Sequence, residues 1–110
     1  MKDSLHSYMK VGIVQSMAFP GADLLASIKK IAEDEFFGAI EISSIPENIR
    51  AEVAKLLGVS KLVVGYCGQP TLLNQKLSLN DLDQKQRESA IAAIKSAVDE
   101  AYFLGARCLR

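Results

Sequence analysis

Short apolar runs alternate with longer segments of helical periodicity along most of this chain. Residues 11–14 (Val-Gly-Ile-Val), 39–42 (Ala-Ile-Glu-Ile) and 62–64 (Leu-Val-Val) are brief, apolar and rich in β-branched side chains, which is typical of buried strands. Residues 107–110 (Arg-Cys-Leu-Arg) occupy the place of a fourth strand. The pattern predicts strands that alternate with helices, and therefore an α/β protein with a parallel sheet.

Three stretches between these runs have apolar residues at helical spacing. We expect the first helix to begin after Asp23, a good N-cap residue, and to end before Gly38. The second is expected to begin near Pro46 and to end at Gly58, and the third to end at Gly105 in the left-handed conformation. The expected core positions are Leu24, Leu25, Ile28, Ile31, Ala32 and Phe36; Ile49, Val53, Leu56 and Leu57; and Ile91, Ile94, Val98, Ala101 and Leu104.

Short connections between strand and helix imply right-handed crossovers and a sheet covered by helices. The connection over residues 65–80 is unusually long for such units. A sheet of three or four parallel strands would leave apolar surface and strand edges exposed. We therefore favour the N-terminal βαβαβα(β) part of a TIM (β/α)8 barrel, a fold of typically about 250 residues, over a small complete α/β domain. Residues 1–110 would then be a single partial domain that stops within its fourth strand.

Composition narrows the classes of partner and the compartment. The 13 basic and 13 acidic residues balance, which argues against a nucleic-acid or anionic membrane partner, because both normally require a basic patch. No apolar run approaches the roughly 20 residues that span a bilayer, and residues 1–10 lack the core of a signal peptide. Cys67 and Cys108 have no CxxC or Cys/His spacing, which suits a reducing compartment. We expect a cytoplasmic protein.

Candidate binding residues lie at the C-terminal ends of the expected strands, where parallel α/β proteins meet their ligands. They are Gln15 after the first strand, Glu41 in the second, and Tyr66 and Gln69 after the third. Because Glu41 alternates with Ile40 and Ile42, its carboxylate is expected to face the interior of the barrel. There it would either bind a substrate hydroxyl, a metal-bound water or a basic side chain, or form a structural ion pair. The sequence favours neither alternative.

The segment 65–70 offers two glycines for a close turn, the Tyr66 hydroxyl, and an amide at Gln69 that suits a polyol. Long loops at this end of a barrel often bind ligands, although an irregular surface loop in which Tyr66 simply packs is an equal alternative. The chain contains no GxGxxG, P-loop, GxSxG or HExxH motif. The lone His6 has no ligand partner at metal spacing, so no metal site is predicted within this chain.

Three segments together resemble one family of barrels. They are Lys10-Val11-Gly12-Ile13-Val14, then Phe36-Phe37-Gly38-Ala39-Ile40-Glu41-Ile42, and finally Ala101-Tyr102-Phe103-Leu104-Gly105-Ala106-Arg107. In order and spacing they are similar to the xylose isomerase-like TIM barrels, also called sugar phosphate isomerases/epimerases. The Gly-x-x-Glu-Ile strand and the long helix that ends in Leu-Gly-Ala are the most telling parts. The resemblance covers nearly the whole chain from Lys10 onward.

The resemblance implies a metal-dependent isomerase or epimerase of carbohydrate metabolism that acts on a small sugar or sugar phosphate, as a monomer or homo-oligomer. A divalent metal (Mn, Mg, Zn or Co) would hold adjacent sugar oxygens while a carboxylate moves a proton next to the carbonyl. Metal ligands in this family lie mainly on later strands, so we expect them beyond Arg110 and expect the 110-residue chain alone to be inactive. Many members place a histidine after the third strand, where this chain has Gly65-Tyr66-Cys67-Gly68. Only Glu41 and this loop carry over, as elements that face the substrate.

Two alternatives to this interpretation stay open. The first is a small non-catalytic α/β module that completes its sheet by oligomerisation or by binding a partner. The second is a DNA repair barrel of the endonuclease IV-like kind, which shares the architecture. The neutral charge and the lack of a basic groove disfavour the DNA repair barrel.

Overall fold

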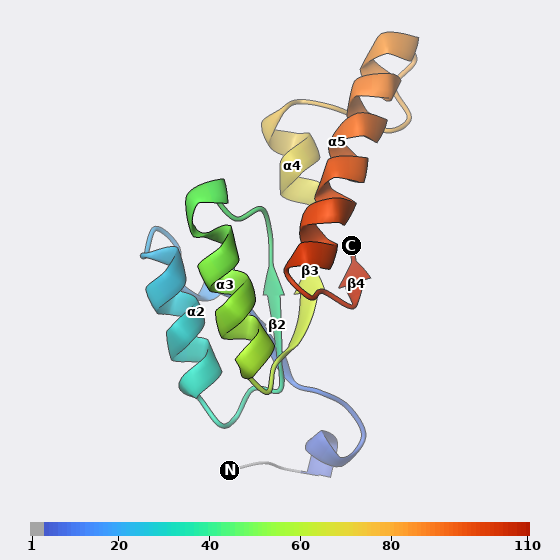
Figure 1. The fold of residues 1–110 in the computed structure, drawn as a ribbon. Coiled ribbons are helices and arrows are strands. Elements are labelled where there is room, and N and C mark those ends of the chain that lie inside the picture. Colours follow the sequence, from blue (N-terminus) through green and yellow to red (C-terminus); the bar gives the residue numbers. More distant parts are fainter. Residues whose placement is uncertain (1–3) are drawn as a thin grey trace.

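The computed structural model describes residues 4–110, which form a four-stranded parallel sheet with helices between the strands (Figure 1). The strands β1 (Gly12–Val14), β2 (Ala39–Ile42), β3 (Val63–Tyr66) and β4 (Cys108–Leu109) lie in sequence order. The longer helices are α2 (Leu24–Glu33), α3 (Glu47–Val59) and α5 (Gln84–Phe103). The short ones are the 3-10 helix η1 (Ser4–Ser7), α1 (Gln15–Ala18) and α4 (Gln69–Asn74). The predicted α/β class with parallel strands is confirmed, and β2 has the predicted bounds.

The core lies between one face of the sheet and the three longer helices. The strands contribute Ile40, Ile42, Val64 and Tyr66, and the helices contribute Ile28, Ile31, Val53, Leu57, Ala97, Ala101 and Leu104. Consecutive parallel strands joined by crossovers of one hand bring every connecting helix to the same face. The two Ile side chains of β2 therefore pack beneath helices, while the residues between them face the other way.

The opposite face of the sheet carries no covering helix in the described part of the chain. Val14, Ala39, Val63 and Gly65 lie on this uncovered face, where they line a shallow hollow of about 310 Å³. They alternate with core residues along their strands, and each is only partly buried. This is the side of the sheet that would form the interior of a closed barrel.

Helix α2 begins as predicted but ends before the expected stop at Gly38. The Asp23 carboxylate accepts the Ala26 N–H at 2.8 Å, which caps the first turn. At the other end the Asp34 carboxylate accepts the Phe36 N–H at 2.8 Å, and this local turn competes with a further helical turn. Phe36 is 36% exposed, so its assignment to the apolar face of the helix was wrong.

The predicted core stripe of α5 is confirmed at its C-terminal end, where Ala101 and Leu104 are buried, but not at Ile91 and Val98. Ile91 and Val98 are 44% and 49% exposed, and the buried positions next to them are Ala90 and Ala97. The expected stripe was therefore wrong by one residue, about 100° around the helix, in this part of α5. The small side chains of the alanines allow the helix to approach its neighbours closely, whereas no described element covers the larger apolar pair.

The long connection after β3 runs over residues 67–83 and is more regular than expected. Gly65 and Tyr66 belong to β3, and Gln69–Asn74 form α4. Together with the N-terminal half of α5, this helix projects beyond the sheet (Figure 1), and the longest dimension of the molecule is 51 Å. No helix within residues 4–110 combines the length and the apolar character that are needed to cross a bilayer.

Two glycines give a matched test of the helix ends. Gly105 adopts φ +80° after α5, and a Cβ there would contact nothing within 4 Å, so Gly105→Ala should lower the free energy of unfolding by about 1–2 kcal/mol through backbone strain alone. Gly58 lies within α3 and also has open space around it. Gly58→Ala should raise the free energy of unfolding by about 0.5–1 kcal/mol. Urea denaturation measures both, and shifts of the same sign would contradict these assignments.

Candidate functional site

An ion pair between Glu41 and Arg110 lies at the C-terminal ends of the strands, on the uncovered face. The Arg110 guanidinium donates through Nη2 to Glu41 Oε1 at 2.6 Å and through Nε to Oε2 at 3.3 Å. Such two-point pairing fixes the geometry of both groups. Glu41 thus faces away from the helices, as its alternation with Ile40 and Ile42 predicts, and meets a basic side chain.

The two partners differ in their access to solvent. The side chain of Arg110 is 65% exposed and that of Glu41 26%. The backbone of Arg110 is anchored because its N–H donates to the Tyr66 carbonyl at 2.8 Å and its carbonyl accepts from the Gly68 N–H at 2.7 Å. Hydrogen bonding to Glu41 and its negative charge both raise the pKa of Arg110. The guanidinium is therefore a fixed cation whose outer edge can contact a ligand.

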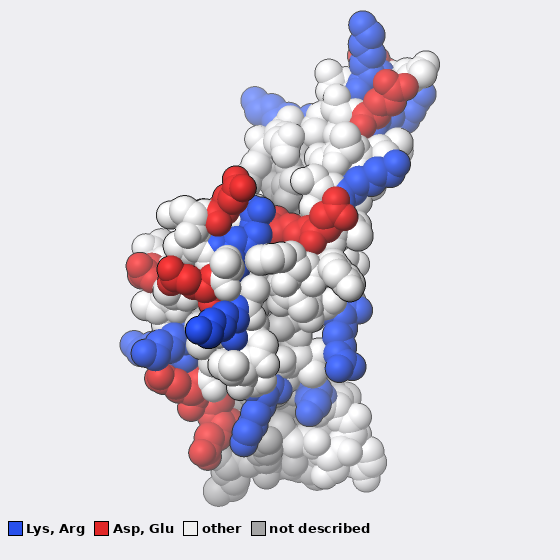
Figure 2. Space-filling model, in the orientation of Figure 1, with Lys and Arg blue, Asp and Glu red and all other residues white. Residues whose placement is uncertain are grey.

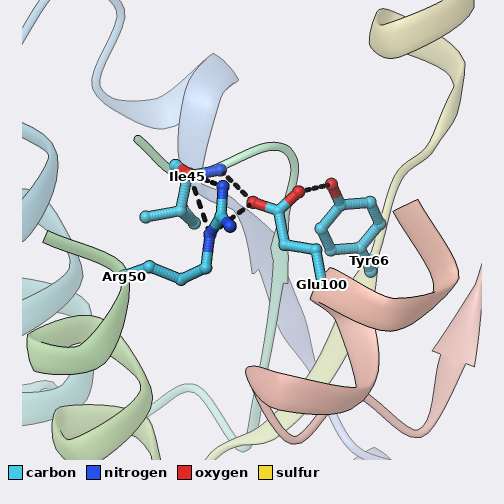
Figure 3. Close-up of polar contacts among 4 residues, drawn as sticks. All are labelled: Ile45, Arg50, Tyr66 and Glu100. Atoms are coloured by element: carbon cyan, nitrogen blue, oxygen red, sulfur yellow. Dashed lines mark hydrogen bonds and ion pairs between the residues drawn. The ribbon is translucent and has the colours of Figure 1, made fainter. Parts of the chain in front are cut away.

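A second polar cluster forms around Glu100 on the helix side of the sheet (Figure 3). Tyr66 donates its hydroxyl to Glu100 Oε2 at 2.6 Å, and the Ile45 N–H donates to Oε1 at 2.7 Å. Arg50 Nε lies 3.3 Å from the same Oε1. Arg50 also donates from Nε and Nη2 to the Ile45 carbonyl at 3.2 and 2.8 Å. The carboxylate thus joins α5 to β3, to the β2–α3 loop and to α3.

Tyr66 is held in its neutral form by this environment. The residue is 1% exposed. Burial and the hydrogen bond to Glu100 raise the pKa of the phenol well above its ordinary value, and contacts with Ser44 and Arg50 oppose this only in part. A phenol that keeps its proton is a hydrogen-bond donor, so Tyr66 orients Glu100 rather than exchanging protons near neutral pH.

The four residues predicted from the sequence do not form one cluster. Glu41 lies on the uncovered face, whereas Tyr66 lies on the opposite face beneath the helices. Gln15 is 6% exposed, and its amide donates to Ser27 Oγ at 2.9 Å, which ties α1 to α2. Gln69 is exposed at the first position of α4. Gln15 and Tyr66 therefore have protein partners on the helix side of the sheet, and Glu41 pairs with Arg110 on the other side.

Three residues of these two clusters were missed by the sequence reasoning: Arg50, Glu100 and Arg110. Glu100 follows Ala97 by three positions and precedes Ala101 by one, so the correct helical register would have placed it at the edge of the buried face. Arg110 and Arg50 carry no local signal, since their partners are distant in sequence or become available only in the folded chain.

The described residues do not supply a metal site. Within residues 4–110 no group of three or more His, Cys, Asp or Glu side chains could hold an ion, and both oxygens of Glu41 contact Arg110.

Basic and acidic side chains are intermixed on the face shown in Figure 2. A comparison with models of known protein families and with curated proteins finds no match to this chain.

Tyr66→Phe tests the second cluster through pH. The variant leaves the Glu100 carboxylate without one hydrogen-bond donor. Its free energy of unfolding at neutral pH should therefore be about 1–2 kcal/mol lower than that of the wild type. Because the pKa of Tyr66 is raised in the folded state, the neutral phenol stabilises the fold fully below about pH 10, the usual tyrosine value, and this contribution falls as the pH rises further. Urea denaturation at increasing pH should therefore show a steeper decline for the wild type than for Tyr66→Phe.

Tyr102→Phe is the matched control, because it removes an exposed phenol hydroxyl from α5. Its free energy of unfolding at neutral pH should stay within about 0.5 kcal/mol of the wild-type value. Equal alkaline slopes for the wild type and Tyr66→Phe would show that Tyr66 ionises alike in the folded and unfolded states.

Proposed function

We propose that this chain supplies three βα units and a fourth strand of a barrel enzyme, a divalent-metal-dependent isomerase or epimerase of sugars or sugar phosphates. The Glu41–Arg110 pair carries the proposal. It is a charged pair on the uncovered face, at the C-terminal ends of β2 and β4, and active sites of parallel α/β barrels lie at that end. The family resemblance of residues 10–107 supports the same substrate class.

Arg110 is the residue that would contact substrate. Its guanidinium has five N–H donors, and only Nε and Nη2 reach Glu41. The remaining donors suit a phosphate group or a pair of sugar oxygens. Glu41 would position this group, because its carboxylate fixes the plane of the guanidinium and partly offsets its charge. Both residues therefore serve in binding and orientation.

The metal that the resemblance implies has no ligand set among residues 4–110. When bound, such a metal would polarise the substrate oxygens.

The uncovered face also favours a second candidate, a non-catalytic module that completes its sheet against another copy. Strands β1 and β4 are the outer strands of the described sheet, and outer strands readily pair with further strands. In a two-fold assembly, β4 of one copy would lie parallel to β1 of the other. Association is then the function, and the Glu41–Arg110 pair is structural.

Arg110→Ala tests the proposed binding role in the protein that contains this chain, assayed for aldose–ketose interconversion and epimerisation. Loss of a charged hydrogen-bond donor removes about 1.5–3 kcal/mol of binding free energy. It should therefore raise KM for sugar phosphates roughly tenfold or more. The effect should be smaller for unphosphorylated sugars. Arg107→Ala is the matched control, since Arg107 is an exposed arginine ahead of β4 and should leave KM unchanged. Equal KM values for the wild type and Arg110→Ala would contradict the role.

Light scattering on the isolated 110-residue chain separates the two candidates. The enzyme proposal predicts no isomerase or epimerase turnover, and no defined dimer, for this chain alone. A stable dimer whose mass is twice that of the 12.0 kDa chain would instead favour the self-associating module. Turnover by the isolated chain would overturn both.

A further inference from the structure

A polar groove follows α5 on the helix side of the sheet, near the C-terminal ends of β2 and β3. The larger part of this α5 groove has a volume of about 530 Å³ and is lined by Ser44, Thr71, Gln75, Ser89 and Ser96, among others. The smaller part, of about 420 Å³, lies between α3 and α5. Arg50, Ser96 and Glu100 line both parts. Each volume falls within the roughly 300–1,000 Å³ of small-molecule pockets.

In the larger part of the α5 groove, the balance of charges favours a neutral ligand. In the larger part Arg50 and Glu100 are the ionisable lining residues, and they pair with each other at 3.3 Å. An anion would approach the Glu100 carboxylate, and a cation would approach Arg50. The smaller part adds Glu47 and Asp99, which disfavour an anion further.

The hydrogen-bonding groups of the α5 groove suit a molecule with several hydroxyls. Hydroxyls and amides both donate and accept, and no side-chain hydrogen bond within residues 4–110 occupies Thr71, Ser89 or Ser96. The Arg50 side chain is 30% exposed, and its Nε and Nη2 face Ile45 and Glu100, which leaves Nη1 as a further donor. Alanines of α5 provide small apolar surface between these groups, suited to the C–H faces of a ring.

We propose that the α5 groove binds a small neutral polyol of monosaccharide size. The Tyr66–Glu100–Arg50 contacts hold the charged wall of the site in place before the ligand arrives, so little ordering is needed on binding. This site is distinct from the substrate edge at Glu41 and Arg110, because the two lie on opposite faces of the sheet. It therefore stands independently of the proposed isomerase.

Titration of the ¹⁵N-labelled chain with myo-inositol, followed by NMR, tests the proposal. We expect saturable shifts confined to amides that line the α5 groove, such as those of Ser44, Gln75 and Ser96. Ser96 is exposed and lines both parts, so Ser96→Leu should fill the groove without disturbing the core. It should weaken inositol binding at least tenfold, equivalent to about 1.4 kcal/mol.

Ser16→Leu is the matched control, because Ser16 is exposed on α1 and lies outside the groove. It should bind inositol like the wild type, and so should Arg110→Ala. Unsaturable or scattered shifts, or unchanged affinity in Ser96→Leu, would overturn the proposal. Saturable binding of inorganic phosphate in place of inositol would overturn the neutral ligand class. Isomerase assays that fail while inositol still binds would remove the proposed function and leave the groove site intact.

Discussion

The Glu100 carboxylate is the contact on which the position of α5 depends. Helix α5 presents mainly alanines to the core, and alanine contributes little apolar area, so packing alone holds this helix weakly. Glu100 adds hydrogen bonds to Tyr66 of β3 and to the Ile45 N–H, together with the ion pair to Arg50 of α3. These contacts are directional, and they fix the rotation of α5 that its small side chains leave undetermined. The α5 groove exists because this rotation is fixed.

The order of the strands places the polar groups of this chain on two separate faces. With consecutive parallel strands, α2, α3 and α5 share one side of the sheet, and alternation along β2 sends Ile40 and Ile42 to that side and Glu41 to the other. This edge of the sheet therefore presents a hydroxyl-rich groove along α5 on the helix side and a charged pair on the uncovered face. The two environments suit different ligands, since the Arg110 cation is open to an anionic group and the groove is not.

Local signals predicted the fold well, and distant contacts account for what they missed. The strand at 39–42 and the cap at Asp23 depend on residues adjacent in sequence, and both were correct. The face of α5 was assigned in part from its larger apolar residues Ile91 and Val98, although the buried residues there are the alanines Ala90 and Ala97. Period-two alternation predicted the side on which Glu41 lies. Its partner is 69 residues away, and no spacing rule predicts such a pair.

The pairing of Glu41 with Arg110 is possible because a glycine lies between their strands. In register, Glu41 of β2 lies beside Gly65 of β3, and Gly65 lies beside Cys108 of β4. Arg110 must therefore reach across a whole strand, about 10 Å at the usual spacing of parallel strands. A Cβ at Gly65 would already lie 3.4 Å from the Cys108 sulfur, so a branched side chain there would occupy the path of the arginine. Gly65 was expected to let a loop over residues 65–70 turn closely, but it lies in β3. There its missing side chain lets β2 and β4 share one charged pair.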